Sequence, residues 1–441
     1  MSLAGIAAHV VSERETTAPD DHLRSLHGAL YCTHERASMV SNPNVTTAPN
    51  PKAPLFTRPF ILLVLAHFMQ ALGWSSMLLL PIYIKHLGST EAQLGTIMAI
   101  ASVGGLLFRP LVGWSLDYVG RRPTLIAGTI LLTVGIFMIG WVDSLGFEIY
   151  AARVLIGIGA GTLFTGYFTY VADFIPESRR TEGLALFGVS GLLPVGFNAF
   201  VYRLDIPVER MNDIYPVVSV LVIASILLLF GVPESRTKPT GADSPKLADV
   251  RSSLTHSTLL PTWFATMIFS TLVAVLMTYV TVTAKQRGVE SAPDLWAYYA
   301  TGAVGVRLLG GRLPDRIGPS NIVVPALSTY VLAFIIAAGA HTYSHFCLAG
   351  LLAGLGHGYC FPVLTSQVVS RIDVQLRGIG LATFTAIWEL TSVGMTPLYG
   401  FISDWYGQAV MFSLAAVIAT SCCTAWVWLE HKFSPTPIAR N

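Results

Sequence analysis

A single glutamate lies in the middle of an apolar segment near the end of the chain. Glu389 is surrounded by apolar and small residues in the segment 378–402. Thr385, Ser392 and Thr396 stand at helical spacing from it, so a helix places these side chains on one face. An ionised carboxylate in such surroundings costs on the order of a few kcal/mol, so it must titrate or find a partner. Three roles remain open: a proton carrier, a contact for the cationic group of a solute, and a structural carboxylate bonded to a nearby hydroxyl or Trp.

An arginine lies in a second apolar segment. Arg153 falls within 147–173, and its guanidinium keeps its charge at any working pH. It therefore contacts an anionic group or a titrating acid, or it packs between helices with its charge satisfied by backbone carbonyls. Polar side chains that we expect in the same region come from other apolar segments: His67, Gln70 and Trp74 on one helical face, Asn198, and His357. An imidazole in such a place is either a hydrogen-bonded fixture or a proton relay.

The elements that hold these residues are predicted from composition. The chain has 441 residues, 53% hydrophobic and 12% charged, whereas soluble domains contain about 25% charged residues. Its mean hydropathy is +0.60. About 20 apolar residues in a helix cross the hydrocarbon core of a bilayer. The sequence therefore predicts an all-α membrane protein with twelve transmembrane helices, at 60–84, 92–113, 124–142, 147–173, 182–202, 214–232, 260–284, 295–313, 321–340, 345–369, 378–402 and 409–429.

A hydrophilic stretch between the sixth and seventh segments divides the helices into two halves. We expect a six-helix bundle at 59–232, a cytoplasmic linker at 233–259 and a second six-helix bundle at 260–430. Residues 1–58 are polar and contain prolines, so we expect a disordered cytoplasmic tail there, and 431–441 form a second cytoplasmic tail. Lys and Arg gather in the loops after even-numbered segments, which the positive-inside rule places in the cytoplasm. The expected location is the inner (plasma) membrane, crossed several times, with both termini cytoplasmic.

The two halves repeat each other in sequence. RPLVGWSLDYVG, from Arg109, matches RLLGGRLPDRIG, from Arg307, at an offset of 198 (307 − 109). RTEGLALF, from Arg180, matches RGIGLATF, from Arg377, at an offset of 197 (377 − 180). Such a parallel repeat is typical of transporters whose two bundles rock about a site at the membrane midplane. Because repeated charges belong to the shared machinery, we expect scaffold or gate roles for Arg109 and Arg307.

Charges without a counterpart are better candidates for contact with a solute or a coupling ion. Glu389 corresponds to Leu192 (389 − 197), and Arg153 corresponds to Gly350 (153 + 197). Each charge is alone in its half. The sequence therefore predicts that these two residues contribute to a coupling or substrate cavity.

Residues at the repeated stretches resemble a known loop signature, GxxxDxxGRR, of the major facilitator superfamily. The residues that carry this resemblance follow helix 2 and, in a partial copy, helix 8: Gly113, Asp117, Gly120, Arg121 and Arg122, then Gly311, Asp315 and Gly318. Arg153, Gly157 and Gly159 are similar to the RxxxGxG motif of helix 4 in that family. RPLVGWSLD resembles the arabinose-efflux-like permease branch.

The resemblance implies a fold of two pseudo-symmetric six-helix halves that alternate between two openings. It also implies that Asp117 faces the N-terminus of helix 11 and pairs with loop arginines, which latches a cytoplasmic gate; the positive end of a helix dipole suits a carboxylate. The alternative is a solvated turn whose arginines only fix the topology. In the second copy Pro319 and Ser320 replace the double arginine, so we expect a weaker latch there.

These observations favour a secondary active transporter that moves a small organic solute by alternating access, with proton-coupled efflux as the leading interpretation. The runner-up is a proton-coupled or facilitated uptake permease for a sugar or an organic acid. The alternative from another class is a non-transporting membrane receptor or scaffold with the same fold.

Other classes of protein find no support in the sequence. It contains no phosphate-binding loop, HExxH motif or nucleophile elbow, so we expect no enzymatic activity and no cofactor. The five cysteines form no CxxC pair, so no metal site is expected. A net charge of +2 gives no reason to expect a nucleic-acid partner. The expected partners are a small-molecule substrate, protons as the coupling ion and the lipid bilayer, and we expect a monomer.

Overall fold

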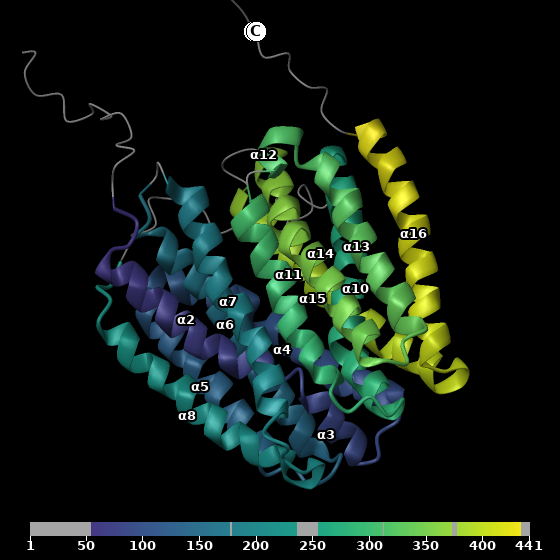
Figure 1. The fold of residues 1–441 in the computed structure, drawn as a ribbon. Helices are drawn as coiled ribbons and strands as arrows, with labels where there is room; N and C mark the ends of the chain where they lie inside the picture. The colour runs from purple at the N-terminus through teal and green to yellow at the C-terminus, as the bar shows by residue number, and fades with distance from the viewer. Residues whose placement is uncertain (1–53, 177–178, 236–254, 312, 373–376, 434–441) are drawn as a thin grey trace, which may run out of the picture. The chain divides into compact units, whose positions relative to one another are not determined.

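The computed structural model describes residues 54–176, 179–235, 255–311, 313–372 and 377–433. Most of the predicted tail 1–58, the middle of the predicted linker 233–259 and most of the predicted tail 431–441 lie outside these ranges. Within them the chain consists of helices, with no strand, joined by turns and short 3-10 segments (Figure 1).

The first half contains six membrane-length helical segments. Two helices separated by one turn, α2 (Arg58–Ser76) and α3 (Leu80–His86), together occupy the first predicted segment. The other five segments are α4 (Glu91–Tyr118), α5 (Arg121–Ile139), α6 (Phe147–Ala172), α7 (Arg180–Tyr202) and, after the 3-10 helix η2 (Val208–Asp213), α8 (Ile214–Phe230).

The second half repeats this order. Its helices are α10 (Leu260–Gln286), α11 (Leu295–Gly310), the short α12 (Leu313–Ile317), α13 (Ser320–Ala338), α14 (Tyr343–Ser370), α15 (Arg377–Tyr406) and α16 (Gln408–Phe433). Short 3-10 helices precede α10 and α11: η3 (Ser257–Leu259) and η4 (Ala292–Asp294). Each of the twelve predicted segments therefore contains a helix, and the predicted fold class is confirmed.

Ten helical segments of the described chain are long and apolar enough to cross a bilayer. The two others, α11 and α15, deviate for visible reasons. α11 has only 16 residues, and about 20 are needed to span. α15 has 30 residues but includes Glu389, Asp404 and a series of hydroxyl residues, which lower its hydropathy. Both α11 and α15 pack along a helix of the other half, α7 and α4 respectively.

Short local signals fix where the helices begin. Hydroxyl side chains cap the N-termini of three helices, with Thr57, Thr90 and Thr342 accepting from backbone N–H groups of α2, α4 and α14. Gly120, between α4 and α5, has φ of 126°, a conformation that residues with a Cβ rarely adopt. Gly318, its counterpart in the second half, has φ of 91°. The repeated glycines therefore both have a positive φ at the turn before the third helical segment of their half.

Within each half, two helices touch backbone to backbone. A Cβ placed on Gly157 of α6 would lie 1.7 Å from the carbonyl oxygen of Ala101 on α4. In the second half a Cβ on Gly354 of α14 would lie 2.1 Å from the carbonyl oxygen of Tyr299 on α11. Small residues permit this close approach of helices in membranes. The pairs α4–α6 and α11–α14 are therefore tightly joined units.

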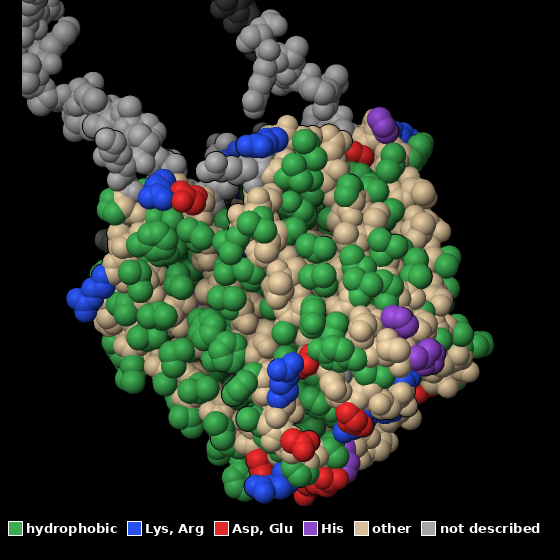
Figure 2. Space-filling view, in the orientation of Figure 1, with side chains coloured by type: hydrophobic (Ala, Val, Ile, Leu, Met, Phe, Trp, Pro, Cys, Tyr) green, Lys and Arg blue, Asp and Glu red, His purple; other side chains and the backbone are tan. Residues whose placement is uncertain are grey.

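The two halves meet along two helix pairs that the repeat relates to each other. α4 packs along α15, and α7 packs along α11. On the face drawn in Figure 2, hydrophobic side chains cover the middle and charged side chains gather toward two ends. We name these the α3 end, which includes the turns α3–α4 and α15–α16, and the α12 end, which includes the turn α4–α5 (Figure 1).

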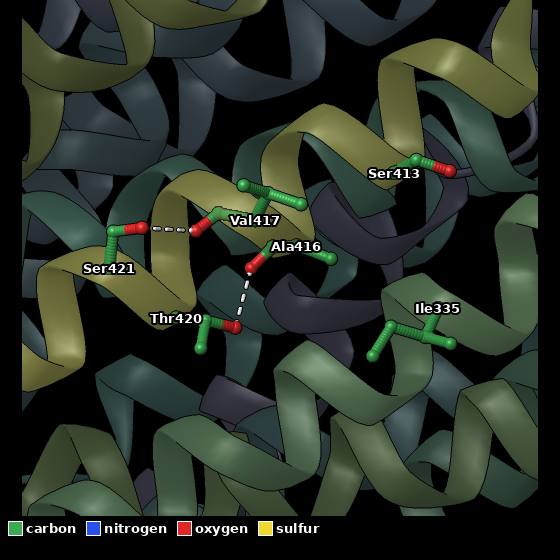
Figure 3. Close-up of a pocket in the computed structure, with 6 residues that line it drawn as sticks. All are labelled: Ile335, Ser413, Ala416, Val417, Thr420 and Ser421. Atoms are coloured by element: carbon green, nitrogen blue, oxygen red, sulfur yellow. Dashed lines mark hydrogen bonds between the residues drawn. The ribbon is translucent and has the colours of Figure 1, made fainter.

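A surface groove lies between α13 and α16 (Figure 3). It has a volume of about 310 Å³ and is lined by Ile335, Ser413, Ala416, Val417, Thr420 and Ser421. Thr420 and Ser421 donate their hydroxyl hydrogens to carbonyls of their own helix, at 2.8 and 3.0 Å, so these donors are already used. The groove contains none of the predicted site residues.

Candidate functional site

An ion pair joins the two halves inside the membrane region. Arg109 Nη2 on α4 lies 3.5 Å from Glu389 Oε1 on α15, and Nη1 of the same arginine donates to the Thr385 hydroxyl. The side chains of Arg109 and Glu389 keep 17% and 20% of their surface exposed. The predicted midplane acid therefore has a cationic partner in the opposite half and is still accessible.

The polar face predicted around Glu389 divides into two parts. Thr385 and Glu389 reach α4, as described above. Ser392 and Thr396 instead donate to carbonyls one turn earlier in α15, at 3.0 and 2.7 Å. Only the first two therefore contribute polar atoms to the contact between the halves.

The side chain of Arg153 contacts backbone carbonyls of a neighbouring helix. Its Nε donates to the carbonyl of Ile97 at 3.1 Å, and its Nη2 donates to the carbonyl of Met98 at 2.6 Å. The residue is only 6% exposed. These contacts, which tie α6 to α4, match the second of the two roles considered for this arginine.

The polar residues predicted on helix 1 do not form a common cluster with Glu389. His67 is buried, shares a 2.7 Å hydrogen bond with the Ser190 hydroxyl and stacks on Phe187. Gln70 is also buried, whereas Trp74 is exposed. Asn198 donates to a carbonyl of its own helix at 2.9 Å. The contacts of His67 are those of a hydrogen-bonded fixture between α2 and α7.

His357 and Arg307 lie together in the second half. Nδ1 of His357 shares a 2.6 Å hydrogen bond with the Tyr299 hydroxyl, which is 3.0 Å from the Tyr330 hydroxyl. Arg307 Nε donates to the carbonyl of Gly358 at 3.4 Å. Within the described residues Arg307 forms no ion pair, unlike its repeat counterpart Arg109.

The loop signature of the first half forms a network at the α12 end. Arg121 Nη1 lies 3.1 Å from Asp117 Oδ1, and its Nε lies 3.5 Å from Asp173. The Glu234 carboxylate accepts from the backbone N–H groups of Arg121 and Arg122, at 2.7 and 3.2 Å, and so caps α5. Asp117 therefore pairs with a loop arginine, as the latch interpretation requires, but both partners belong to the first half.

Gly113 stands beside this network and has open space where a Cβ would be. In the second copy of the signature Gly311 ends α11, while the side chain of Asp315 lies outside the described part of the structure. The second half is tied at this end by Arg371 and Glu430, whose Nη1 and Oε2 atoms are 3.0 Å apart. These ion pairs at the α12 end each lie within one half.

At the α3 end, by contrast, polar contacts cross between the halves. Asp404, near the end of α15, accepts from the backbone N–H of Glu91 at 2.7 Å and of Ala92 at 2.8 Å, the first residues of α4. The related helix pair is joined by Arg203 at the end of α7 and Asp294 at the start of α11, 2.7 Å apart. The hydrogen bonds that Arg203 donates to the Asp294 carboxylate raise the pKa of Arg203 above its ordinary value. The halves are therefore bonded together at the α3 end.

Five acids that make these contacts were not identified from the sequence. These acids lie at helix ends or in turns, where an acid is ordinary: Asp173, Glu234, Asp294, Asp404 and Glu430. The signal that could have suggested Asp404 is its place in SDWYG, just before a glycine that ends a helix. A carboxylate facing a helix N-terminus, expected for Asp117, is present at the opposite end as Asp404.

Comparisons with known proteins agree with this architecture. The family model described as Major Facilitator Superfamily matches residues 63–390 and 295–441. The uncharacterized MFS-type transporter YhhS of Escherichia coli (strain K12) is 25% identical over 359 residues, which cover 79% of this chain and 86% of YhhS.

Two solved structures share the fold at low sequence identity. The nucleoside transporter NupG has a TM-score of 0.70 at 13% identity, over 85% of this chain and 99% of its own. A POT family transporter in complex with 5-aminolevulinic acid has a TM-score of 0.72 at 12% identity, over 86% of this chain and 97% of its own. With two repeated six-helix halves and a family model that matches it over most of its length, the chain belongs to the major facilitator superfamily of membrane transporters.

Proposed function

We propose that this protein is a proton-coupled secondary transporter that exports a small organic solute by alternating access. The observation that supports it best is the contact of Arg109 with Glu389, because a titratable carboxylate there meets a permanent charge of the opposite half. Proton uptake by Glu389 then changes the force between the halves. A structural carboxylate within one half would have no such effect.

The size of the effect is sufficient for coupling. Two full charges about 4 Å apart attract by about 4 kcal/mol at an effective dielectric constant of about 20. Partial exposure of both side chains reduces this value. Even about 1.4 kcal/mol changes an equilibrium tenfold. Protonation of Glu389 therefore shifts the balance between the two openings. Arg109 Nε is buried and has no hydrogen-bond partner among the described residues, so this donor can bind another partner.

The proposed direction of transport and the proposed orientation of the protein in the membrane are both inferred from the sequence. Export follows from the resemblance of RPLVGWSLD to efflux permeases. The Lys and Arg distribution places the α12 end and both termini in the cytoplasm of a cell whose inner membrane holds the protein. In that orientation the bonded α3 end is the outer gate, and it is closed.

The test is proton flux in proteoliposomes that contain the purified full-length protein. A panel of amphipathic drugs, sugars and organic acids is added to wild type and to Glu389→Gln. We expect one class of solute to move protons in wild type and none to do so in the variant, because glutamine keeps the shape of the side chain but cannot bind a proton. Exchange of labelled solute without a gradient should persist in the variant.

Glu209→Gln is the matched control, since it removes an exposed glutamate in η2. It should behave as wild type. Equal solute-driven proton movement in wild type and Glu389→Gln would disprove coupling through this carboxylate. Solute movement against its gradient in the opposite direction would replace export with uptake.

A further inference from the structure

The repeat places Arg307 where Arg109 stands in the other half, but with different groups opposite it. Thr385 and Glu389, which face Arg109, correspond to Gly188 (385 − 197) and Leu192 (389 − 197) on α7. The structure agrees with this correspondence, because Arg307 Nη1 lies 2.8 Å from the position that a Cβ on Gly188 would take. Both arginines therefore reach across to the opposite half, and only one finds an acid and a hydroxyl there.

Arg307 is consequently a cation whose charge is not balanced. Its single hydrogen bond among the described residues is the 3.4 Å contact from Nε to the Gly358 carbonyl, and a guanidinium has five N–H donors. The residue is half-buried within a membrane helix. An unpaired charge in such a place is costly and is retained where it has a partner or a function. On α7 the positions that face Arg307 hold Gly188 and Leu192, whereas the corresponding positions on α15 hold Thr385 and Glu389.

A second donor and an aromatic surface lie beside this arginine. His357, adjacent in sequence to Gly358, uses Nδ1 for Tyr299, and its Nε2 has no hydrogen-bond partner within the described residues. The ring of His357 meets Phe269 edge to face at 5.3 Å, and Phe269 meets Trp388 at 5.0 Å. Phe269 is fully buried, whereas Trp388 is partly exposed, so an anionic group held by Arg307 and His357 would be close to an aromatic cluster in which Trp388 can pack against an apolar body.

We propose that Arg307, with His357 beside it, binds the anionic group of the transported solute opposite Gly188, and that the solute is an organic anion with an aromatic or apolar body. This inference rests on the proposed transport function and specifies its substrate class. A planar guanidinium binds a carboxylate through two parallel hydrogen bonds. Scaffold and gate roles account for the shared position of the two arginines, but not for the loss of the acid opposite one of them.

Binding to the purified full-length protein in detergent tests the proposal without any gradient. Benzoate, benzamide and benzylamine have similar shapes and differ in charge, and their affinities are compared by calorimetry. We expect benzoate to bind at least tenfold more tightly than the other two. Arg307→Gln should remove this preference, whereas Arg307→Lys should keep part of it. Arg210→Gln, which removes an exposed arginine of η2, controls for net charge.

A second variant tests the missing acid on α7. Leu192→Glu puts an acid where the first interface has Glu389, so Arg307 should pair with it and benzoate affinity should fall at least tenfold. Leu192→Gln has similar size without charge and should bind benzoate within about threefold of wild type, which separates charge from misfolding. Unchanged benzoate affinity in both Arg307→Gln and Leu192→Glu overturns the proposal.

The result for other anions completes the test. A wild-type protein that binds none of benzoate, benzenesulfonate and phenylphosphonate also overturns the proposal. Benzoate binding without any solute-driven proton movement would retain the anion site and refute proton coupling. If Arg307→Gln transported a neutral solute with protons as well as wild type does, proton coupling would be retained and the anion site refuted.

Discussion

The contact of Asp404 with the start of α4 predicts how strongly the α3 end is held closed. The carboxylate accepts two hydrogen bonds from the backbone N–H groups of Glu91 and Ala92, and both residues are 6% exposed. In Asp404→Asn the amide keeps one acceptor oxygen, but its NH₂ group faces the second N–H donor. The variant also loses the negative charge at a helix N-terminus.

The magnitude follows from these two losses. A hydrogen bond to a charged group contributes about 1.5–3 kcal/mol, and a charge at a helix N-terminus contributes about 0.3–1 kcal/mol. Because Asp404 itself is exposed, solvent screening favours the lower end of both ranges. We expect Asp404→Asn to weaken the closed state by about 1.5–2 kcal/mol, which makes the open state about 10–30 times more populated.

Hydrogen exchange measured by mass spectrometry reports this change directly. The amides of Glu91 and Ala92 are protected only while Asp404 accepts from them, so the peptide that covers the start of α4 should exchange about 10–30 times faster in Asp404→Asn. The peptide around Asp294, in the related contact with Arg203, should also exchange faster, because the halves separate together. Asp213→Asn breaks an exposed ion pair of η2 at the same end and should change neither peptide.

Two outcomes refute the reasoning in different ways. Unchanged exchange at the start of α4 would mean that Asp404 does not hold this end. Faster exchange there with no change around Asp294 would mean that α4 frays locally while the halves stay together.

Two further predictions concern stability, measured as the thermal unfolding of the purified protein. Gly157→Ala should destabilise by about 1–3 kcal/mol or more, since the added Cβ would overlap the backbone of α4, whereas Gly394→Ala, with open space around it, should stay within about 0.5 kcal/mol of wild type; equal effects of the two would contradict the backbone contact. Glu430→Gln should cost about 3–5 kcal/mol, because it leaves the buried Arg371 guanidinium without its carboxylate. Glu182→Gln, which breaks an exposed pair, should cost at most about 1 kcal/mol, and a similar loss in both would show that burial is not what makes the first pair important.

The helices were predictable because lipid imposes a simple requirement. A segment that spans the bilayer must pair its backbone N–H and C=O groups with one another in a helix, and it must be apolar for about 20 residues. The repeat was equally informative: an offset counted in the sequence correctly relates Arg109 to Arg307, each of which reaches the opposite half. Glu389 is apparent as the one acid in the predicted apolar segment 378–402.

The partners of these residues could not be predicted in the same way. A carbonyl oxygen has two lone pairs, so those of Ile97 and Met98 accept from Arg153 while remaining in a helix, and no residue type marks such a site. Asp404 and the start of α4 are more than 300 positions apart in the chain. Their contact depends on how the halves are placed, which local pattern does not encode.

The glycine contacts between α4 and α6, and between α11 and α14, make each half mechanically stiff. Two backbones in direct contact have no side chains between them that could deform or change rotamer. In the alternating-access mechanism proposed above, each half would then turn as a rigid body about the interface around Arg109 and Glu389. Because a rigid body transmits displacement without loss, a molecule that separates the halves at the α12 end would also stabilise their contacts at the α3 end, and its binding would be measurable as slower hydrogen exchange there.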